Sequence, residues 1–287
     1  MPTRASSRGI CLFPGIVAAF TLLPFPAHAL QTPANCATGE SSALVAKVVR
    51  HELDTASTQG RWMYTAAYTE NGIQYVSRNV QTDDGIISWI VTRNGVPLSR
   101  DSRLKQIQGL ISNESALARN RKAMISDAAS INSLLAALPG SVQFGCAVRT
   151  GDVAQVDFQP KPGYSPWNIE QRIIAGMSGS LQLNLKEMRL TSASGAVQSD
   201  LFLFMGLGRI YRGSTISLSR AKTSTGAWET SYVSTHISGQ ILFLKTVAKN
   251  RDESRTDYCP VPEGLRAQDV VPYLSSSGCP TIMGGKS

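Results

Sequence analysis

Two histidines, His51 and His236, are the only imidazole bases beyond the first thirty residues. Hydrolysis by a Ser-His-Asp arrangement needs such a base within hydrogen-bond reach of the nucleophile. His51 lies beside Glu52 on a predicted helix and His236 lies at the end of a predicted strand, so we expect both at the surface. No Gly-x-Ser-x-Gly nucleophile elbow accompanies them. The sequence therefore predicts a protein that is not an enzyme.

Two glycine-containing stretches partly match phosphate-binding loops. Gly206-Leu207-Gly208 begins like a dinucleotide loop, but its next glycine is Gly213, and the stretch joins two predicted strands. A dinucleotide loop needs Gly-x-Gly-x-x-Gly followed by the N-terminus of a helix. The final residues 284–287 end like a phosphate loop, but Pro280 replaces its first glycine. We therefore expect no nucleotide and no cofactor.

Cysteine spacing favours disulfides over a metal site. Beyond Cys11 the chain contains Cys36, Cys146, Cys259 and Cys279. No two of them have the two-to-four-residue spacing of a zinc knuckle, and four cysteines in an oxidising compartment have three possible connectivities. We favour Cys259 with Cys279, because that bond would order a Pro-rich tail with little core of its own. Cys36 with Cys146 follows by elimination.

The first residues have the pattern of an export signal. Arg4 and Arg8 precede an apolar run from Ile10 to Phe25, and Ala27-His28-Ala29 forms a small-x-small cleavage site. The run is interrupted by prolines and is shorter than the roughly 20 residues of a membrane span. Residues 33–35, Pro-Ala-Asn, do not form the motif that lipid attachment to Cys36 needs. We predict a signal peptide over 1–29 and a soluble periplasmic protein that does not span the membrane.

The charge pattern excludes a dense nucleic-acid-binding patch. The chain has a formal net charge of +8, but its lysines and arginines are scattered along the sequence. Nucleic-acid sites usually combine clustered basic residues with interleaved aromatics. We therefore expect no nucleic-acid partner.

Hydrophobic periodicity predicts a helix followed by strands in the first hundred residues. Ser41 or Ser42 can cap a helix whose apolar stripe runs from Leu44 to Leu53. Alternation from Trp62 onward predicts three antiparallel strands that end near Arg93. Asn71-Gly72, Asp83-Asp84-Gly85 and Asn94-Gly95 have the composition of tight turns between strands.

The remaining residues predict a helical insertion and a second set of strands. Residues 99–138 have helical spacing of leucine and isoleucine, and Pro139-Gly140 is expected to stop the helices. Strands and one short helix follow, with a predicted hairpin turn at Ser238-Gly239. We assign residues 30–249 to one domain. Residues 250–287 are polar and Pro-rich, and we expect a partly disordered tail.

A phrase around the Pro-rich corner resembles a known family. It comprises Phe158, Pro160, Pro162, Tyr164, Pro166, Glu170, Arg172 and Gly176-Met177-Ser178-Gly179. Arg212-Gly213 after an apolar strand and Asn94 to Ser99 before the helical insertion extend the match to about residues 43–245. This ordered set is similar to an uncharacterised envelope branch of the outer-membrane lipoprotein-sorting (LolA/LolB-like) superfamily.

The resemblance implies a fold and a function. The fold class would be α+β, an unclosed antiparallel β-barrel, or half-barrel, wrapped around helices. Its hollow would hold a hydrophobic or lipid-linked ligand, with candidate lining residues Trp62, Tyr64, Tyr68, Trp89, Phe202 and Phe204. The corner residues, including Glu170, Arg172 and Gly179, would be structural. The positions of Glu170 and Arg172 beside the short helix separately favour a charged pair that fixes the corner over two exposed charges, which would contribute less than about 1 kcal/mol.

The expected function is that of a non-catalytic periplasmic binding protein or carrier. An alternative is an envelope sensor or interaction module that engages an envelope protein partner through an exposed strand edge of the same fold. Lipid bound to the purified protein would favour the carrier, and a single protein partner would favour the sensor.

Overall fold

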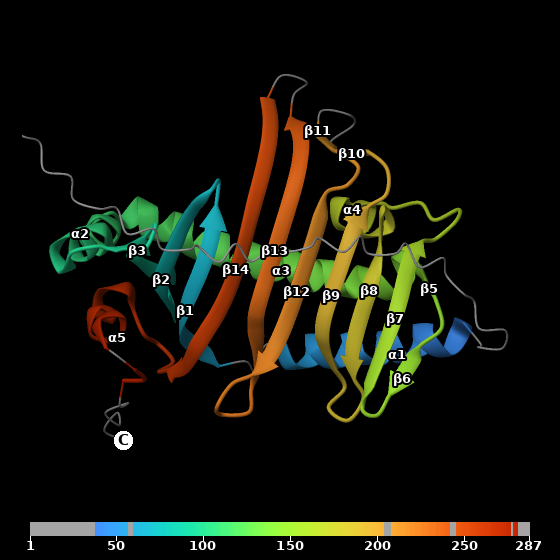
Figure 1. Ribbon diagram of the computed structural model, residues 1–287, viewed down its shortest axis with the longest axis horizontal. Coiled ribbons are helices and arrows are strands. Elements are labelled where there is room, and N and C mark those ends of the chain that lie inside the picture. Colours follow the sequence, from blue (N-terminus) through green and yellow to red (C-terminus); the bar gives the residue numbers. More distant parts are fainter. Residues whose placement is uncertain (1–37, 57–59, 204–207, 242–244, 277, 281–287) are drawn as a thin grey trace, which may run out of the picture. The chain divides into compact units, whose positions relative to one another are not determined.

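The computed structural model describes residues 38–56, 60–203, 208–241, 245–276 and 278–280. These residues belong to one compact unit, Pro33–Ser287. Their strands form a fourteen-stranded, entirely antiparallel sheet (Figure 1). The strands are β1 Arg61–Glu70, β2 Ile73–Thr82, β3 Gly85–Arg93, β4 Val96–Pro97, β5 Val142–Phe144, β6 Val148–Thr150, β7 Val153–Pro160, β8 Met177–Asn184, β9 Arg189–Val197, β10 Leu201–Leu203, β11 Gly208–Ile210, β12 Thr215–Lys222, β13 Trp228–Ile241 and β14 Lys245–Val261.

The sheet is not closed. Its main order is β4-β3-β2-β1-β14-β13-β12-β9-β8-β7-β5, while β6 pairs with β7 and the β10–β11 hairpin pairs with β13. Five α-helices accompany the described strands: α1 Thr38–Ala56, α2 Arg100–Ile111, α3 Glu114–Ser141, α4 Ile169–Ala175 and α5 Val271–Ser275. A short 3-10 helix, η2, covers Ala267–Asp269. The α+β class and the open antiparallel sheet are therefore as predicted.

Tight turns set the register of the first strands as the sequence predicts. Asn71 and Gly72 have φ angles of 51° and 78°, and Asn94 and Gly95 have φ angles of 49° and 75°. Two successive residues with positive φ suit a two-residue hairpin, since this conformation matches the twist of the flanking strands. Gly85 also has a positive φ and follows Asp83-Asp84 in the predicted turn.

The prediction of a loosely ordered tail is wrong for residues 250–261, which continue β14. This strand lies inside the sheet between β1 and β13. Its sequence is polar, but Arg251, Glu253 and Arg255 lie on one side of the strand, and each arginine forms an ion pair of 2.6 Å with Glu253. A charged strand can occupy the interior of a sheet when its charges are paired in this way. The predicted Cys259–Cys279 disulfide is present and attaches the C-terminal segment to β14.

Three local predictions are also wrong. Ser238-Gly239 is not a turn, because β13 runs through it and Gly239 pairs with Ile210 of β11. Pro139 does not stop α3, which continues to Ser141; in the last turn a proline removes only one hydrogen bond. Ser41 does not cap α1 but lies inside it, and its hydroxyl accepts a hydrogen bond from the Ala147 N–H.

Two hydrophobic cores lie toward opposite ends of the sheet order. The first joins α1 and the end of α3 to β5, β7, β8 and β9, and includes Val48, Leu138 and Leu181. The second joins β1, β2, β3 and β14 to α2 and α5, and includes Met63, Ile107 and Leu274. The helices therefore pack at the two ends of the sheet order, and the surface of the strands between those ends differs from both cores.

The Pro-rich corner is fixed by contacts other than the expected charged pair. Residues two apart on a helix point in different directions, and no Glu170–Arg172 ion pair occurs among the described residues. Arg172 instead donates to the Phe202 carbonyl at 2.7 Å. The Ser141 hydroxyl donates to the Tyr164 hydroxyl at 3.0 Å, which attaches the corner to the end of α3. Asn168 caps α4, and its side-chain oxygen accepts a hydrogen bond from the Gln171 N–H at 2.8 Å.

Candidate ligand-binding site

Three of the predicted lining residues lie together on β1. Trp62 and Tyr64 are buried, Tyr68 is half-buried, and their alternation places them on the same side of the strand. The Tyr258 ring stacks on Tyr64, with centroids 5.3 Å apart, and meets Trp62 edge-on at 6.0 Å. Trp62, Tyr64 and Tyr68 thus belong to one aromatic cluster. Tyr258 of β14 also belongs to it, although the sequence did not indicate this residue.

The other predicted lining residues lie elsewhere. Trp89 is buried in the second core, where the Arg103 guanidinium of α2 lies over its ring, and it shares the side of the sheet occupied by Met63. Phe202 is 53% exposed on β10, and only Leu201 of that strand is buried. Phe204 lies outside the described residues. Cys36 does too, so its pairing with Cys146 stays a prediction.

The aromatic cluster lies on the helix-facing side of the sheet. Residues that are Cα partners on neighbouring strands point to the same side of a sheet. One row of such partners runs from the first core to the cluster: Leu181, Ala193, Leu218, Val233, Glu253 and Tyr68. Because Leu181 packs in the core beneath α1, the whole row faces the side on which α1 lies.

A ladder of charges on β14 borders the cluster. The Arg251 guanidinium lies 3.9 Å from the centroid of the Tyr68 ring, and the Arg255 guanidinium lies 5.1 Å from that of Tyr64. Glu253, between them, is buried. Burial alone would raise the pKa of Glu253, but the charges of Arg255 and Arg251 outweigh it and lower that pKa overall. The ladder is therefore a stably ionised strip beside the aromatic rings.

Helix α3 connects the two cores across the middle of the sheet. Leu117 near its beginning packs on the second core, and Leu138 near its end is buried in the first. The seven strand-to-strand steps from β3 to β8 cover about 34 Å. A helix of 28 residues is about 42 Å long, which is enough to cover that distance. Figure 1 shows α3 crossing behind the central strands.

The middle of α3 is exposed to solvent. Helical spacing places Met124, Ala128 and Ile131 on the same stripe as Leu117 and Leu138. Ile131 nevertheless remains 57% exposed, and every residue of 121–132 except the half-buried Met124 is exposed. Solvent therefore reaches the stripe of Leu117 and Leu138 within this segment, which we name the open span of α3 (residues 121–132).

Strands β12 and β13 carry apolar side chains that are also incompletely buried. Leu218 and Val233 are Cα partners on the helix-facing side, and Ile216 shares their side because it is two residues from Leu218. Ile216 is 41% exposed, while Leu218 and Val233 are half-buried. We name these three residues the apolar floor. The apolar surface of the floor is therefore partly exposed to solvent, as is that of the open span.

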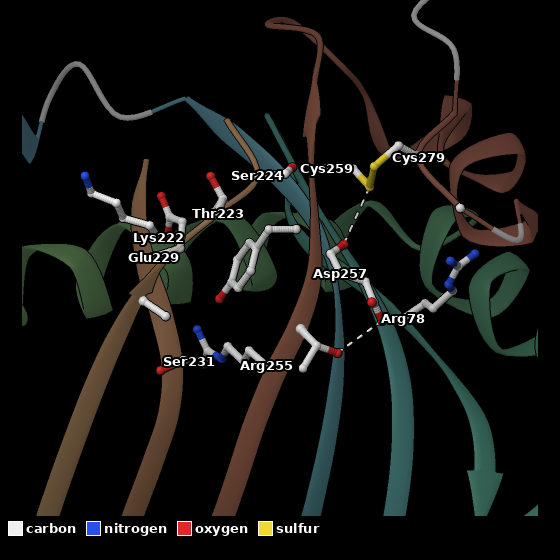
Figure 2. A pocket seen from close by; sticks show the side chains of 14 residues that line it. Arg78, Lys222, Thr223, Ser224, Glu229, Ser231, Arg255, Asp257, Cys259 and Cys279 are labelled. Atoms are coloured by element: carbon white, nitrogen blue, oxygen red, sulfur yellow. Dashed lines mark hydrogen bonds between the residues drawn. A yellow bond between two sulfur atoms is a disulfide. The ribbon is translucent and has the colours of Figure 1, made fainter. Parts of the chain in front are cut away.

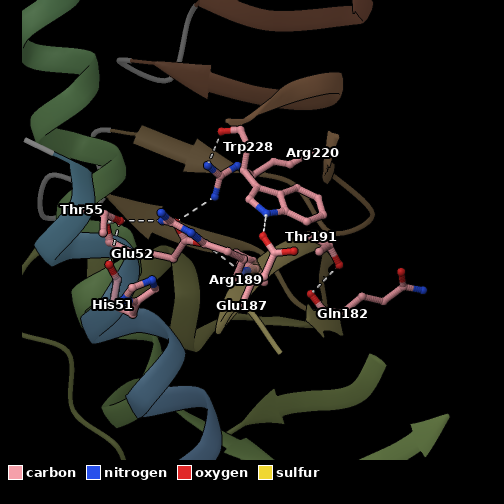
Figure 3. Close-up of polar contacts among 10 residues, drawn as sticks. His51, Glu52, Thr55, Gln182, Glu187, Arg189, Thr191, Arg220 and Trp228 are labelled. Atoms are coloured by element: carbon pink, nitrogen blue, oxygen red, sulfur yellow. Dashed lines mark hydrogen bonds and ion pairs between the residues drawn. The ribbon is translucent and has the colours of Figure 1, made fainter. Parts of the chain in front are cut away.

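A buried ionic cluster lies beside the end of α1, between this helix and the sheet (Figure 3). Glu52 is 5% exposed and accepts hydrogen bonds from Arg189 at 2.9 Å, Arg220 at 2.8 Å and the Leu190 N–H at 2.8 Å. Arg220 also donates to the Trp228 carbonyl at 2.7 Å. The cluster fixes α1 to β9 and β12 and thereby defines one boundary of the apolar floor.

The histidine most suited to catalysis does not activate a serine. The Asp252 carboxylate accepts from Ser234 at 2.7 Å and also contacts His236 Nε2 at 3.1 Å. Ser234 therefore donates to the carboxylate rather than to the imidazole, unlike the order of a catalytic triad. His51 lies on α1, half-buried beside Glu52. Within the described part of the chain, no group of three His, Cys, Asp or Glu residues has a metal-binding arrangement.

Two patterns in the sequence indicate the Glu52 cluster and the charge ladder of β14. Glu52 is four residues after Val48 and seven after Val45, so it occupies the buried stripe of α1. A carboxylate on such a stripe predicts a buried cationic partner. Arg251-x-Glu253-x-Arg255 has the alternation of a strand with a charged side. The identity of the partners, Arg189, Arg220, Tyr68 and Tyr64, depends on contacts distant in sequence.

None of the helices within the described residues is long and apolar enough to cross a membrane. Comparison of the chain with protein-family models, with curated proteins and with solved structures finds no match.

Proposed function

We propose that this chain is a non-catalytic periplasmic binding protein or carrier that holds an apolar or lipid-linked ligand between the open span of α3 and the apolar floor. The observation that carries the proposal is Ile131, which is 57% exposed although it lies on the same stripe of α3 as the buried Leu138. A helix that only completed a core would bury that stripe along its whole length. The exposed stripe therefore favours a surface reserved for a ligand.

The energetics favour a ligand with an alkyl chain. Each buried methylene contributes about 0.8 kcal/mol, so ten methylenes would contribute about 8 kcal/mol before the costs of association. Arg251 is the neighbour of Thr235 on the helix-facing side, and its side chain is 30% exposed beside the floor. Because this guanidinium already pairs with Glu253 and Glu70, the alkyl chain rather than a charged end would carry the binding.

The open sheet and the helices across one of its sides are the features that support a LolA/LolB-like half-barrel. In that proposal, α3 takes the place of the helix that covers the hollow. The edges of the sheet support the alternative function less well, because β4 has two residues and includes Pro97, and β5 has three residues. Short edge strands and prolines discourage the addition of a partner strand.

Native mass spectrometry of the protein purified gently from its own envelope tests this function. A carrier should retain a lipid or acylated peptide that disappears after extraction with organic solvent. An unliganded protein recovered with one stoichiometric protein partner would contradict the proposal and favour the interaction module.

A further inference from the structure

Strands β13 and β14 separate before either one ends. Their ladder runs from Ile241 and Lys245 to Tyr232 and Ser254, although β13 begins at Trp228 and β14 continues to Val261. A pocket of about 520 Å³ lies where the strands part (Figure 2). The Tyr258 hydroxyl crosses the separation and donates to the Thr230 carbonyl. We name this opening the β13–β14 split.

Irregularities in both strands shape the split. In β13, Ser231 is an extra residue between two positions that pair with adjacent residues of β12. In β14, Asp257 has a φ of 55°, a left-handed conformation that residues other than glycine seldom adopt. Such irregularities are common where a strand redirects a side chain toward a site. Ser231 and Asp257 both line the pocket.

Two of the five charged side chains that line the pocket already have close partners. Lys222 Nζ lies 2.6 Å from the Glu187 carboxylate, and Arg255 Nε lies 2.6 Å from that of Glu253. Glu187 and Glu253 themselves do not line the pocket. These two cations therefore leave little charge for a ligand to neutralise.

The other three charged side chains lack a partner of opposite sign. Among the described residues, Arg78, Glu229 and Asp257 form no ion pair within 4.0 Å. Arg78 donates only to the Leu274 carbonyl and the Ser276 hydroxyl, each at 3.5 Å. Burial raises the pKa of Glu229, and the charges of the nearby Arg220 and Arg255 offset this effect only in part. A ligand would complement the pocket if it carried cationic groups for the acids and one anionic group for Arg78.

We propose that the β13–β14 split binds a small basic zwitterion, a free basic amino acid or a dipeptide that contains one. Its α-ammonium and its side-chain cation, an ammonium or a guanidinium, bind Glu229 and Asp257, and its carboxylate binds the fork of Arg78. A volume of about 520 Å³ is typical of small-molecule sites, which span roughly 300–1,000 Å³. Arg78 pairs with Thr65 and so lies on the opposite side of the sheet from Tyr64. Arg255 and Tyr258 line the split from the Tyr64 side, but Ile216, Leu218 and Val233 do not line it, so the split is a second site beside the aromatic cluster and separate from the apolar floor.

Isothermal titration calorimetry on the full-length, disulfide-intact protein tests this site. L-Arginine and L-lysine should bind and L-glutamate should not. Glu229→Gln and Asp257→Asn should each weaken L-arginine binding about tenfold, the effect of one lost charged hydrogen bond. Glu263→Gln removes the same charge from an exposed residue outside the pocket and should leave binding unchanged. Because Asn tolerates a positive φ, Asp257→Asn should fold even if Glu229→Gln does not.

The carboxylate contact has a separate test. Agmatine is arginine without its carboxylate, so Arg78→Gln should weaken L-arginine binding to the level of agmatine and leave agmatine binding unchanged. The proposal is wrong if neither amino acid nor a lysine-containing dipeptide binds at millimolar concentration. It is also wrong if L-glutamate binds in their place, or if folded Asp257→Asn binds L-arginine as the wild type does.

Discussion

Glu52 of α1 and Arg220 of β12 form an ion pair of 2.8 Å although 168 residues separate them in the sequence. Their side chains are 5% and 12% exposed, and Arg189 binds the same carboxylate from β9. The pair joins the first helix to the strands that contribute Ile216 and Leu218 to the apolar floor. The position of the proposed site therefore depends on a contact between distant parts of the chain.

Removing the charge of Glu52 should destabilise the protein strongly. Glu52→Gln leaves two nearly buried guanidinium groups without their anion, and breaking such a pair costs about 3–5 kcal/mol. Asp54→Asn removes the same charge from an exposed position on the same helix and should change stability by less than about 0.5 kcal/mol. Urea unfolding measures both. Equal effects of the two variants would mean that the cluster contributes nothing.

A methyl group at Gly179 should not be tolerated. A Cβ atom there would overlap the Ser194 carbonyl oxygen on the neighbouring strand, so Gly179→Ala should cost about 1–3 kcal/mol. Gly109 in α2 has no atom within 4 Å of such a Cβ, and Gly109→Ala should stabilise by about 0.5–1 kcal/mol. Thermal unfolding should move in opposite directions for the two variants. A shift of the same sign in both would contradict the close approach of β8 and β9.

Stability should fall in acid through Asp84. Burial alone would raise the pKa of Asp84, but the Ala267 N–H and Arg266 outweigh it and lower that pKa below its ordinary value of 3.8. A lowered folded-state pKa contributes stability above the unfolded-state pKa, and this is lost as the pH falls through the folded-state pKa. Urea unfolding of Asp84→Asn should therefore show a smaller loss between about pH 5 and about pH 2 than the wild type. Parallel pH profiles would exclude this role.

The Cys259–Cys279 disulfide should stabilise the C-terminal segment. Replacing both cysteines with serine should lower the free energy of unfolding by about 2–4 kcal/mol, because the bond closes a loop with a sequence separation of 20. The double variant is preferable to a reducing agent because it leaves Cys36 and Cys146 unchanged. Limited proteolysis should then cleave near α5 before the sheet. Unchanged cleavage would show that Leu274, which is 1% exposed, holds the segment without the bond.

Local patterns predicted most elements, but partners distant in sequence could not be predicted. Asn-Gly turns and alternating apolar residues identified β1 to β3, and a three-and-four stripe identified α1, because those signals depend on neighbouring residues. The polar sequence of β14 concealed a central strand. Arg251 and Arg255 are neutralised by Glu253 within the strand and lie over tyrosines of β1. These contacts depend on the order of the strands in the sheet, which composition does not give.

The candidate site was predicted only in part for the same reason. Alternation placed Trp62, Tyr64 and Tyr68 on one side of β1, as the strand has them, while their role as lining residues stays a prediction. Trp89 occupies the opposite side because each strand has its own register, which sequence alone does not give. The exposure of Ile131 depends on which elements pack on α3, and helical periodicity alone does not give those contacts.

Binding of an anthroyloxy-labelled fatty acid to two tryptophan variants of α3 tests the central claim most directly. Ile131→Trp would occupy the space between α3 and the apolar floor, whereas Ile125→Trp adds the same group at an equally exposed position about 120° around the helix. The wild type and Ile125→Trp should bind the probe with similar affinity, and Ile131→Trp should lose most of that binding while unfolding at a similar temperature. Absence of binding to the wild type, or equal binding by the two folded variants, would contradict the account.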